Sequence, residues 1–250
     1  TGGYTVPEVL AGRFIDRVRN SMAVMRAGAV TVPMTSDTLN IARLGQPDSI
    51  SPAIQTAQWK SENAVIDETD LTLERVRFTA RTLPVLLKMS VELSEDSVNI
   101  DEAIERELSQ QLALELDRVA LLGSGTPPEP RGVLNQSGVG VTDLGTSVDD
   151  FDFMVDAVGR LWAQNHEPSG MLYNASLATA IAKFKETSTN QPLRMPDVIA
   201  SIPKFRTNQI ANAGTSPDET SLYVADWSQL LIGLRTSFRL EVSRTAGTAF

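Results

Sequence analysis

His166 is the single histidine of the sequence, and imidazole is the side chain that titrates nearest to neutral pH. It lies in the run Asn165-His166-Glu167-Pro168, between a predicted helix and a predicted strand. A histidine base needs a nucleophile and an orienting acid, and the sequence contains no Gly-x-Ser-x-Gly elbow. The pattern therefore favours an exposed loop histidine over a catalytic base.

The sequence contains few side chains that bind transition metals. The sequence contains no cysteine and one histidine, which excludes cysteine-ligated sites and multi-histidine centres within one chain. The acids that could be read as a divalent-metal patch are Glu92, Glu95, Asp96, Asp101 and Glu102. No Asp-x-Asp-x-Asp-Gly loop accompanies them, and acids near a helix start are stabilised by the helix dipole. We expect neither a metal nor a cofactor.

Three other clusters could bind ligands. Gly123-Ser124-Gly125-Thr126 superficially resembles a phosphate cradle, but it follows a predicted helix and precedes prolines, which indicates a helix end and a turn. A second group of acids predicts a helix start with a solvated face: Asp149, Asp150, Asp152 and Asp156. A basic face on the N-terminal helix could contact a partner or a phosphate, with a solvated face as the alternative: Arg13, Arg17, Arg19 and Arg26.

Charge and length narrow the function further. The 22 Lys+Arg and 31 Asp+Glu leave a net charge of −9, which disfavours tight non-specific binding to duplex DNA. The 250 residues suffice for one or two domains with their own core. No apolar run approaches the roughly 18 residues that a membrane span needs. No motif supports an enzyme, so we expect a protein without catalytic activity.

The strongest predicted element is a helix over residues 100–122. Asn99 can cap its start, with Glu102 completing a capping box, and Gly123 follows as a C′ candidate. At about 1.5 Å per residue this helix is a rod of roughly 35 Å, longer than a small domain needs. Its predicted core face is an apolar row with a spacing of four: Ile100, Ile104, Leu108, Leu112 and Leu116.

A long charged hairpin is predicted before this helix, with arms over residues 56–66 and 69–83. The apolar parity changes between Leu73 and Val76, which predicts a β-bulge. The hairpin has too few apolar residues for its own core, so it must lie on its own body or on a neighbouring chain. Its charged residues are candidate assembly contacts: Lys60, Glu62, Asp67, Glu68, Asp70, Glu74, Arg75 and Arg77.

The remaining segments complete an α+β fold class with segregated elements. We expect an amphipathic helix over residues 7–25, a helix capped by Asp150, and a strand over 170–173 followed by a helix that Asn174 caps. The chain is predicted to form two lobes, leaving the first near Gly123 and returning to it near Gly233.

Four stretches together resemble the tailed-bacteriophage major capsid protein family, which has the Hong Kong ninety-seven phage fold. The most specific is the long helix closing in Gly123-Ser-Gly-Thr126 and followed by Gly132-Val-Leu-Asn135, which resembles the family's spine helix and its entry into the A-domain. The hairpin resembles the E-loop running into the P-domain. The other two stretches resemble the A-domain core and the return to the P-domain: residues 170–177, and residues 222–228 with 240–244.

The resemblance implies four parts. They are an N-terminal arm and helix (1–35), a discontinuous P-domain (36–55, 80–130 and 235–250), an E-loop hairpin (56–79) and an A-domain (131–234). It also implies a protein located in the virion and assembled in the bacterial host cytoplasm, without contact with a membrane. Its main partner would be itself, in hexamers and pentamers that tile an icosahedral shell around double-stranded DNA. Further implied partners are a portal, a scaffold, a maturation protease and decoration proteins.

Other readings stay open at this stage. An encapsulin-type nanocompartment shares the fold and encloses cargo enzymes, and a small hydrolase would use His166 or the acids over residues 92–101. The resemblance also implies further chain before Thr1 and a further P-domain strand after Phe250. Some relatives crosslink through a hairpin lysine, and because none follows Lys60 in the predicted hairpin we expect no isopeptide crosslinking here.

Overall fold

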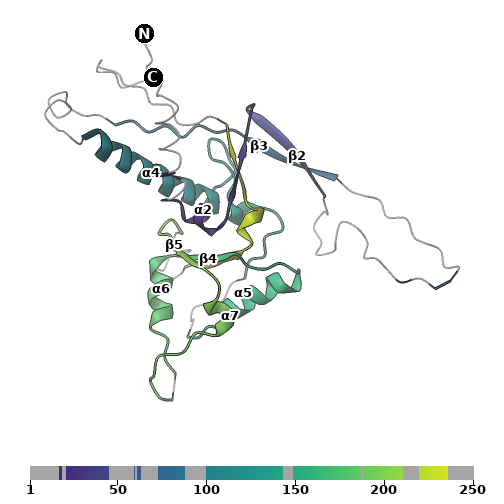
Figure 1. Cartoon of the computed structure of the whole chain (residues 1–250), viewed down its shortest axis with the longest axis vertical. Helices are drawn as coiled ribbons and strands as arrows, with labels where there is room; N and C mark the ends of the chain where they lie inside the picture. The colour runs from purple at the N-terminus through teal and green to yellow at the C-terminus, as the bar shows by residue number, and fades with distance from the viewer. Residues whose placement is uncertain are drawn as a thin grey trace, which may run out of the picture.

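The structure is a computed structural model, and it describes residues 17–18, 21–44, 59, 61–62, 73–87, 100–142, 149–186, 188–210 and 220–235. Figure 1 shows a long helix across one lobe, a second lobe of short helices around a small sheet, and a two-stranded arm that projects away from both. Within the described part of the chain, no helix is both long and apolar enough to cross a membrane. The mixed helices and strands confirm the predicted α+β class.

Helix α4 (Ile100–Leu122) has the predicted bounds over its 23 residues. The fully buried stripe, however, lies one position away from the predicted apolar row: Ser109, Ala113, Asp117 and Leu121. The predicted row is half-buried at Ile104, Leu108, Leu112 and Leu116, while the side chain of Ile100 lies outside the description. The small side chains of Ser109 and Ala113 let the N-terminal segment pack closest along their stripe, where Val18 and Met22 contact Ala113.

The single helix predicted over residues 7–25 is wrong at Met22, whose backbone is extended (φ −73°, ψ 125°). A separate short helix, α2 (Ala23–Ala27), begins at the next residue. The cause is Asp117 of α4, because its carboxylate accepts the N–H groups of Ala23 and Val24 in place of helical carbonyls. The part of the predicted helix over residues 7–16 lies outside the described residues.

The projecting arm is a ribbon of β2 (Thr38–Leu44) and β3 (Leu73–Thr79), paired antiparallel from Thr38↔Thr79 to Leu44↔Leu73. Among the described residues β3 pairs along its whole length with β2. Residues 56–66, the predicted partner of this strand, lie outside the described residues except for 59, 61 and 62, none of which is in a strand. The predicted bulge is wrong within β3, because the register is unbroken. The half-buried pairs Leu39↔Phe78 and Ile41↔Val76 set one apolar face along the ribbon.

Two further sheets connect distant parts of the chain. β1 (Val30–Pro33) pairs parallel with β7 (Leu231–Leu234), which brings the chain near Gly233 back beside the N-terminal segment. In the second lobe, β4 (Gly170–Tyr173) lies between parallel β5 (Lys204–Arg206) and antiparallel β6 (Tyr223–Ala225). All four residues of β4 are buried.

The second lobe packs its helices on one face of that sheet. They are α5 (Asp152–Ala163), α6 (Ala175–Ala182) and α7 (Asp197–Ala200), and the 3₁₀ turns η1 (Val133–Asn135) and η2 (Trp227–Gln229) connect this lobe to the rest. Asn174 accepts the Leu177 N–H at 2.9 Å, as predicted for its cap. Asp150 accepts the Asp152 N–H at 3.0 Å, but Phe151 is the capping residue of α5.

β4 separates two hydrophobic cores because its side chains alternate. Met171 and Tyr173 pack with the helices of the second lobe, where Phe151 and Phe184 meet edge-on at 5.3 Å. Leu172 faces the other way, into a core built from both lobes: Ala23, Val24, Ala27, Ala29, Leu121, Ile210 and Trp227. This second cluster, the junction core, connects the lobes by packing as well as by the chain.

The turn after α4 depends on two glycines in backbone contact. A Cβ on Gly132 would lie 2.4 Å from the nitrogen of Gly123 and 2.6 Å from the oxygen of Val119. Gly123 is equally tight, with a would-be Cβ at 2.3 Å from the oxygen of Pro130. Gly123 follows the helix as predicted, and the close approach of Gly132 is the reason that glycine is required there.

Gly132→Ala should destabilise the subunit by about 3 kcal/mol, because the new methyl meets backbone atoms that cannot move aside. Gly159→Ala is the matched control, since its would-be Cβ meets nothing within 4 Å in helix α5. That substitution should raise the free energy of unfolding by about 0.5–1 kcal/mol through helix propensity. Urea denaturation of both variants measures the difference, and similar effects at the two positions would contradict the packing argument.

Candidate assembly surfaces

His166, the acid–base candidate considered from the sequence, is exposed. Asp226 accepts both the N–H and the hydroxyl of Ser228. The Ser228 hydroxyl is the main cause that lowers the pKa of Asp226, and the charge of His166 affects it only slightly. Glu167, the residue after His166, accepts the indole N–H of Trp162 at 3.0 Å.

The predicted acidic patch has structural partners where it is described. Glu102 lies 3.9 Å from Arg17 and 3.7 Å from Arg106, and Glu105 lies 3.4 Å from Arg17. Glu92, Glu95 and Asp96 lie outside the described residues, as does the side chain of Asp101. Among the described residues no group of three or more His, Cys, Asp or Glu is placed to bind a metal ion.

The glycine-rich turn binds a carboxylate of its own chain. Glu129 accepts the Ser124 N–H at 2.9 Å and also pairs with Arg118, which bridges it to Glu115. The Ser124 N–H, followed by Arg118, lowers the pKa of Glu129 to about 2. As in a phosphate cradle, a backbone N–H of this turn binds an anion, but the anion is the carboxylate of Glu129 from the same chain.

The predicted basic face is used within the molecule. Arg17 pairs with the acids of α4, and the guanidinium of Arg26 lies 5.5 Å from the centre of the Phe205 ring. Arg13 and Arg19 lie outside the described residues. The described arginines of this face thus attach the N-terminal segment to both lobes.

Asp117 is the central polar group of the junction, and sequence reasoning missed it. Its side chain is 2% exposed, and its two oxygens accept the N–H groups of Ala23 at 2.8 Å and Val24 at 3.1 Å. Burial raises the pKa of this carboxyl, although the two N–H donors and Arg26 oppose that effect. The available signal was an acid four residues from Ala113 and four from Leu121, on a stripe that is otherwise small or apolar.

Ser169 and Trp227 connect the other end of α2 to the second lobe. The Ser169 hydroxyl donates to the carbonyl of Ala27 at 3.1 Å and accepts the Trp227 N–H at 2.9 Å. The Trp227 indole donates to the carbonyl of Gly170 at 2.9 Å, and its ring is 1% exposed. Helix α2 is thereby bonded to α4 at its start and to the sheet at its end.

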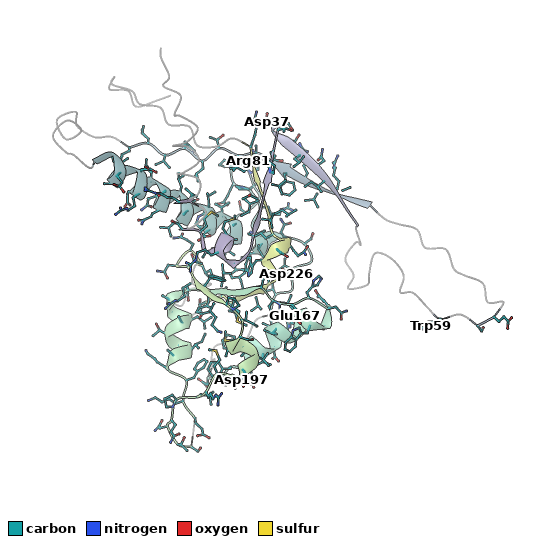
Figure 2. The ribbon with its side chains drawn as sticks, viewed as in Figure 1. Asp37, Trp59, Arg81, Glu167, Asp197 and Asp226 are labelled. Carbon is teal, nitrogen blue, oxygen red and sulfur yellow. The ribbon has the colours of Figure 1, made fainter. Side chains whose placement is uncertain are left out.

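The arm presents its predicted contact residues to solvent. Arg75 and Arg77 are exposed on one face of the ribbon, and Glu62 is exposed beyond it. Trp59 lies beyond the ribbon, away from the body, and is fully exposed at 105% of the reference area (Figure 2). Four of the predicted residues, Lys60, Asp67, Glu68 and Asp70, lie outside the described residues, as does the side chain of Glu74.

These features define a class of protein: a two-lobed α+β subunit with a long helix and a projecting arm that exposes one charged face (Figure 1). A family model for the phage capsid family matches residues 2–250. The chain belongs to the phage capsid family, and its fold is the Hong Kong ninety-seven phage fold expected from the sequence.

Individual relatives agree with this assignment. The chain is 20% identical over 259 aligned residues to the major capsid protein of Klebsiella oxytoca phage phiKO2, covering 98% of this chain and 59% of the relative. It therefore spans about three-fifths of that protein's length. Among solved structures it resembles Mycobacterium phage Adephagia, with a TM-score of 0.63 at 16% identity over 86% of this chain and 71% of that chain. It also resembles the capsid of a native GTA particle computed with C5 symmetry, with a TM-score of 0.57 at 18% identity over 82% and 74%.

Asp117→Ala tests the attachment of α2 to α4. The variant leaves the N–H groups of Ala23 and Val24 without acceptors in a buried position, so the free energy of unfolding should fall by about 3 kcal/mol. Glu107→Ala is the control, since Glu107 is exposed on the same helix and should change stability by less than about 0.5 kcal/mol. Equal losses in urea denaturation would show that the Asp117 bonds contribute nothing.

Asp117→Asn isolates the charge. Because burial raises the pKa of Asp117, the folded chain retains this proton to higher pH than the unfolded chain. The stability contributed by the group is therefore full below the unfolded pKa and falls as pH rises through the raised value. The stability of the native chain relative to Asp117→Asn should increase as pH is lowered from about 7 to about 4, and a pH-independent difference would refute this.

Proposed function

We propose that this chain forms the body of a phage major capsid protein, which assembles with copies of itself into a closed shell around double-stranded DNA. Family membership supports the class of function. The observation that carries the proposal for this chain is the arm, a two-stranded ribbon that projects from the body (Figure 1) and exposes Arg75 and Arg77. A two-stranded ribbon is marginal in water alone, so a neighbouring chain that covers it gives it a stable environment.

The proposed parts follow the boundaries expected from the sequence. The first lobe with α4 corresponds to the P-domain, the lobe built on β4 to the A-domain, and the ribbon to the stem of the E-loop. The junction core would then hold the proposed A-domain and P-domain together within one subunit. Hexamers and pentamers are the proposed capsomers, and a portal, scaffold, maturation protease and decoration proteins are proposed further partners.

The role proposed is structural rather than catalytic, within the virion after assembly in the host cytoplasm. The net charge of −9 supports it, because a container should not grip a genome that it must release. An encapsulin-type shell is not favoured, since the relatives found are phage and GTA capsids. The exposed loop position of His166 gives no support to the hydrolase alternative.

Electron microscopy of the full gene product tests the proposal. Expression should yield rings or closed shells, and His166→Ala should assemble with the same yield because this side chain is exposed and outside every core. A strictly monomeric full-length protein at high concentration would contradict the proposed function. Loss of a measured hydrolytic activity on His166→Ala would instead support the alternative.

A further inference from the structure

An arginine row lies on one face of the arm. Arg75 and Arg77 alternate along β3 and are both exposed, and Arg81 continues the same parity just past the strand. On a strand, alternate side chains project from one face about 7 Å apart. The row therefore presents two guanidinium groups side by side, with a third further along the arm.

Among the described residues of the ribbon, no acid faces this row. The cross-strand partner of Arg75 is Ala42 and that of Arg77 is Asn40, so the facing side chains carry no charge. Among the described residues no ion pair involves Arg75, Arg77 or Arg81. Most other described cations are engaged, for instance Arg235 with Asp37 and Arg194 with Asp197.

The same chain carries an unmatched acidic pair of similar spacing. Asp152 and Asp156 are exposed at the start of α5, four residues apart on one helix face, which separates them by about 6 Å. Within the described part of the chain, no cation pairs with either carboxylate. The acids of α4 differ, because Glu102, Glu105 and Glu115 already face arginines.

We propose that the arginine row of the arm binds the acidic pair Asp152 and Asp156 on a second copy of this chain. The contact joins two different surfaces of identical chains, head to tail, and such contacts generate rings when the rotation closes. Arg–carboxylate pairs are directional and often bidentate, so the contact would set the register of the arm as well as attract it. This inference rests on the proposed function, since it needs copies of the chain in one assembly.

A second copy suits the row better than nucleic acid does. The chain carries a net charge of −9, so the positive arginine row is complementary in charge to the mostly negative surface of another copy of the chain. Duplex DNA would be repelled by that overall charge, and three arginines neutralise few phosphates. Binding of the packaged nucleic acid by this row is therefore an outcome that the experiment must separate.

The test reverses the charges. Arg75→Glu combined with Arg77→Glu, in the full gene product, should reduce the yield of shells at least tenfold, as judged by sedimentation and negative-stain microscopy. The control is Lys183→Glu combined with Lys185→Glu, which makes the same change in net charge at two exposed positions on the other lobe. This control should assemble like the unaltered protein. Adding Asp152→Lys and Asp156→Lys to the arm variant should restore assembly.

Each result decides one point. Shells at the normal yield from the arm variant would overturn the inference, as would equal loss from the lysine control. Normal shells that lack nucleic acid would assign the row to the genome and would also overturn it. Failure of the compensating change to restore assembly, with the variant still folded by circular dichroism, would overturn the α5 half. Absence of shells from the unaltered protein would instead count against the proposed function itself.

Discussion

The carboxylate of Asp117 is the constraint on which the arrangement of the described chain depends. It is buried in the long helix, and it accepts two backbone N–H groups that begin a new helix at Ala23. Those donors are free to bond it only because the preceding helix stops at Met22. The break turns the chain into α2, whose far end bonds to Ser169 and, through it, to Trp227. One buried acid thus determines where the N-terminal segment meets both lobes.

The junction is rigid for reasons of packing as well as hydrogen bonding. Leu172 and Trp227 fill the space between the lobes with side chains that are 0% and 1% exposed. At the C-terminal end of α4, Gly132 and Gly123 bring two backbones into a contact that no larger residue would permit. The arm differs in kind, because its apolar face is only half-buried and Arg75 and Arg77 are exposed on the other face. The two lobes thus pack against each other within the described part of one chain, whereas the arm keeps an exposed face that we propose a second copy covers.

The sequence predicts local structure well and long-range pairing poorly. The helix over Ile100–Leu122 follows from a regular apolar row and capping residues, all of which are local. Its buried stripe does not, because what packs against Ala113 and Asp117 comes from more than ninety residues away. Likewise β3 was recognised as a strand, but its partner β2 lies across a long intervening segment rather than next to it. The candidate site is likewise only partly predictable. The sequence shows which residues of the arm are charged, but the face on which each lies follows only from the pairing register of β2 and β3.

The pairing register of β2 and β3 decides which charged side chains of the arm lie on the same face. The sequence from Lys60 to Arg77 contains both acids and bases, and it marks them as candidate assembly contacts without assigning them to a face. Pairing with β2 places Leu39 and Ile41 against Phe78 and Val76, which puts Arg75 and Arg77 together on the opposite face. Because Ala42 and Asn40 are their cross-strand neighbours, no described acid of the ribbon faces these two arginines. The apolar side chains on one face of the ribbon thus place a basic surface on the other face of an acidic chain, and this is the surface that we propose a second copy binds.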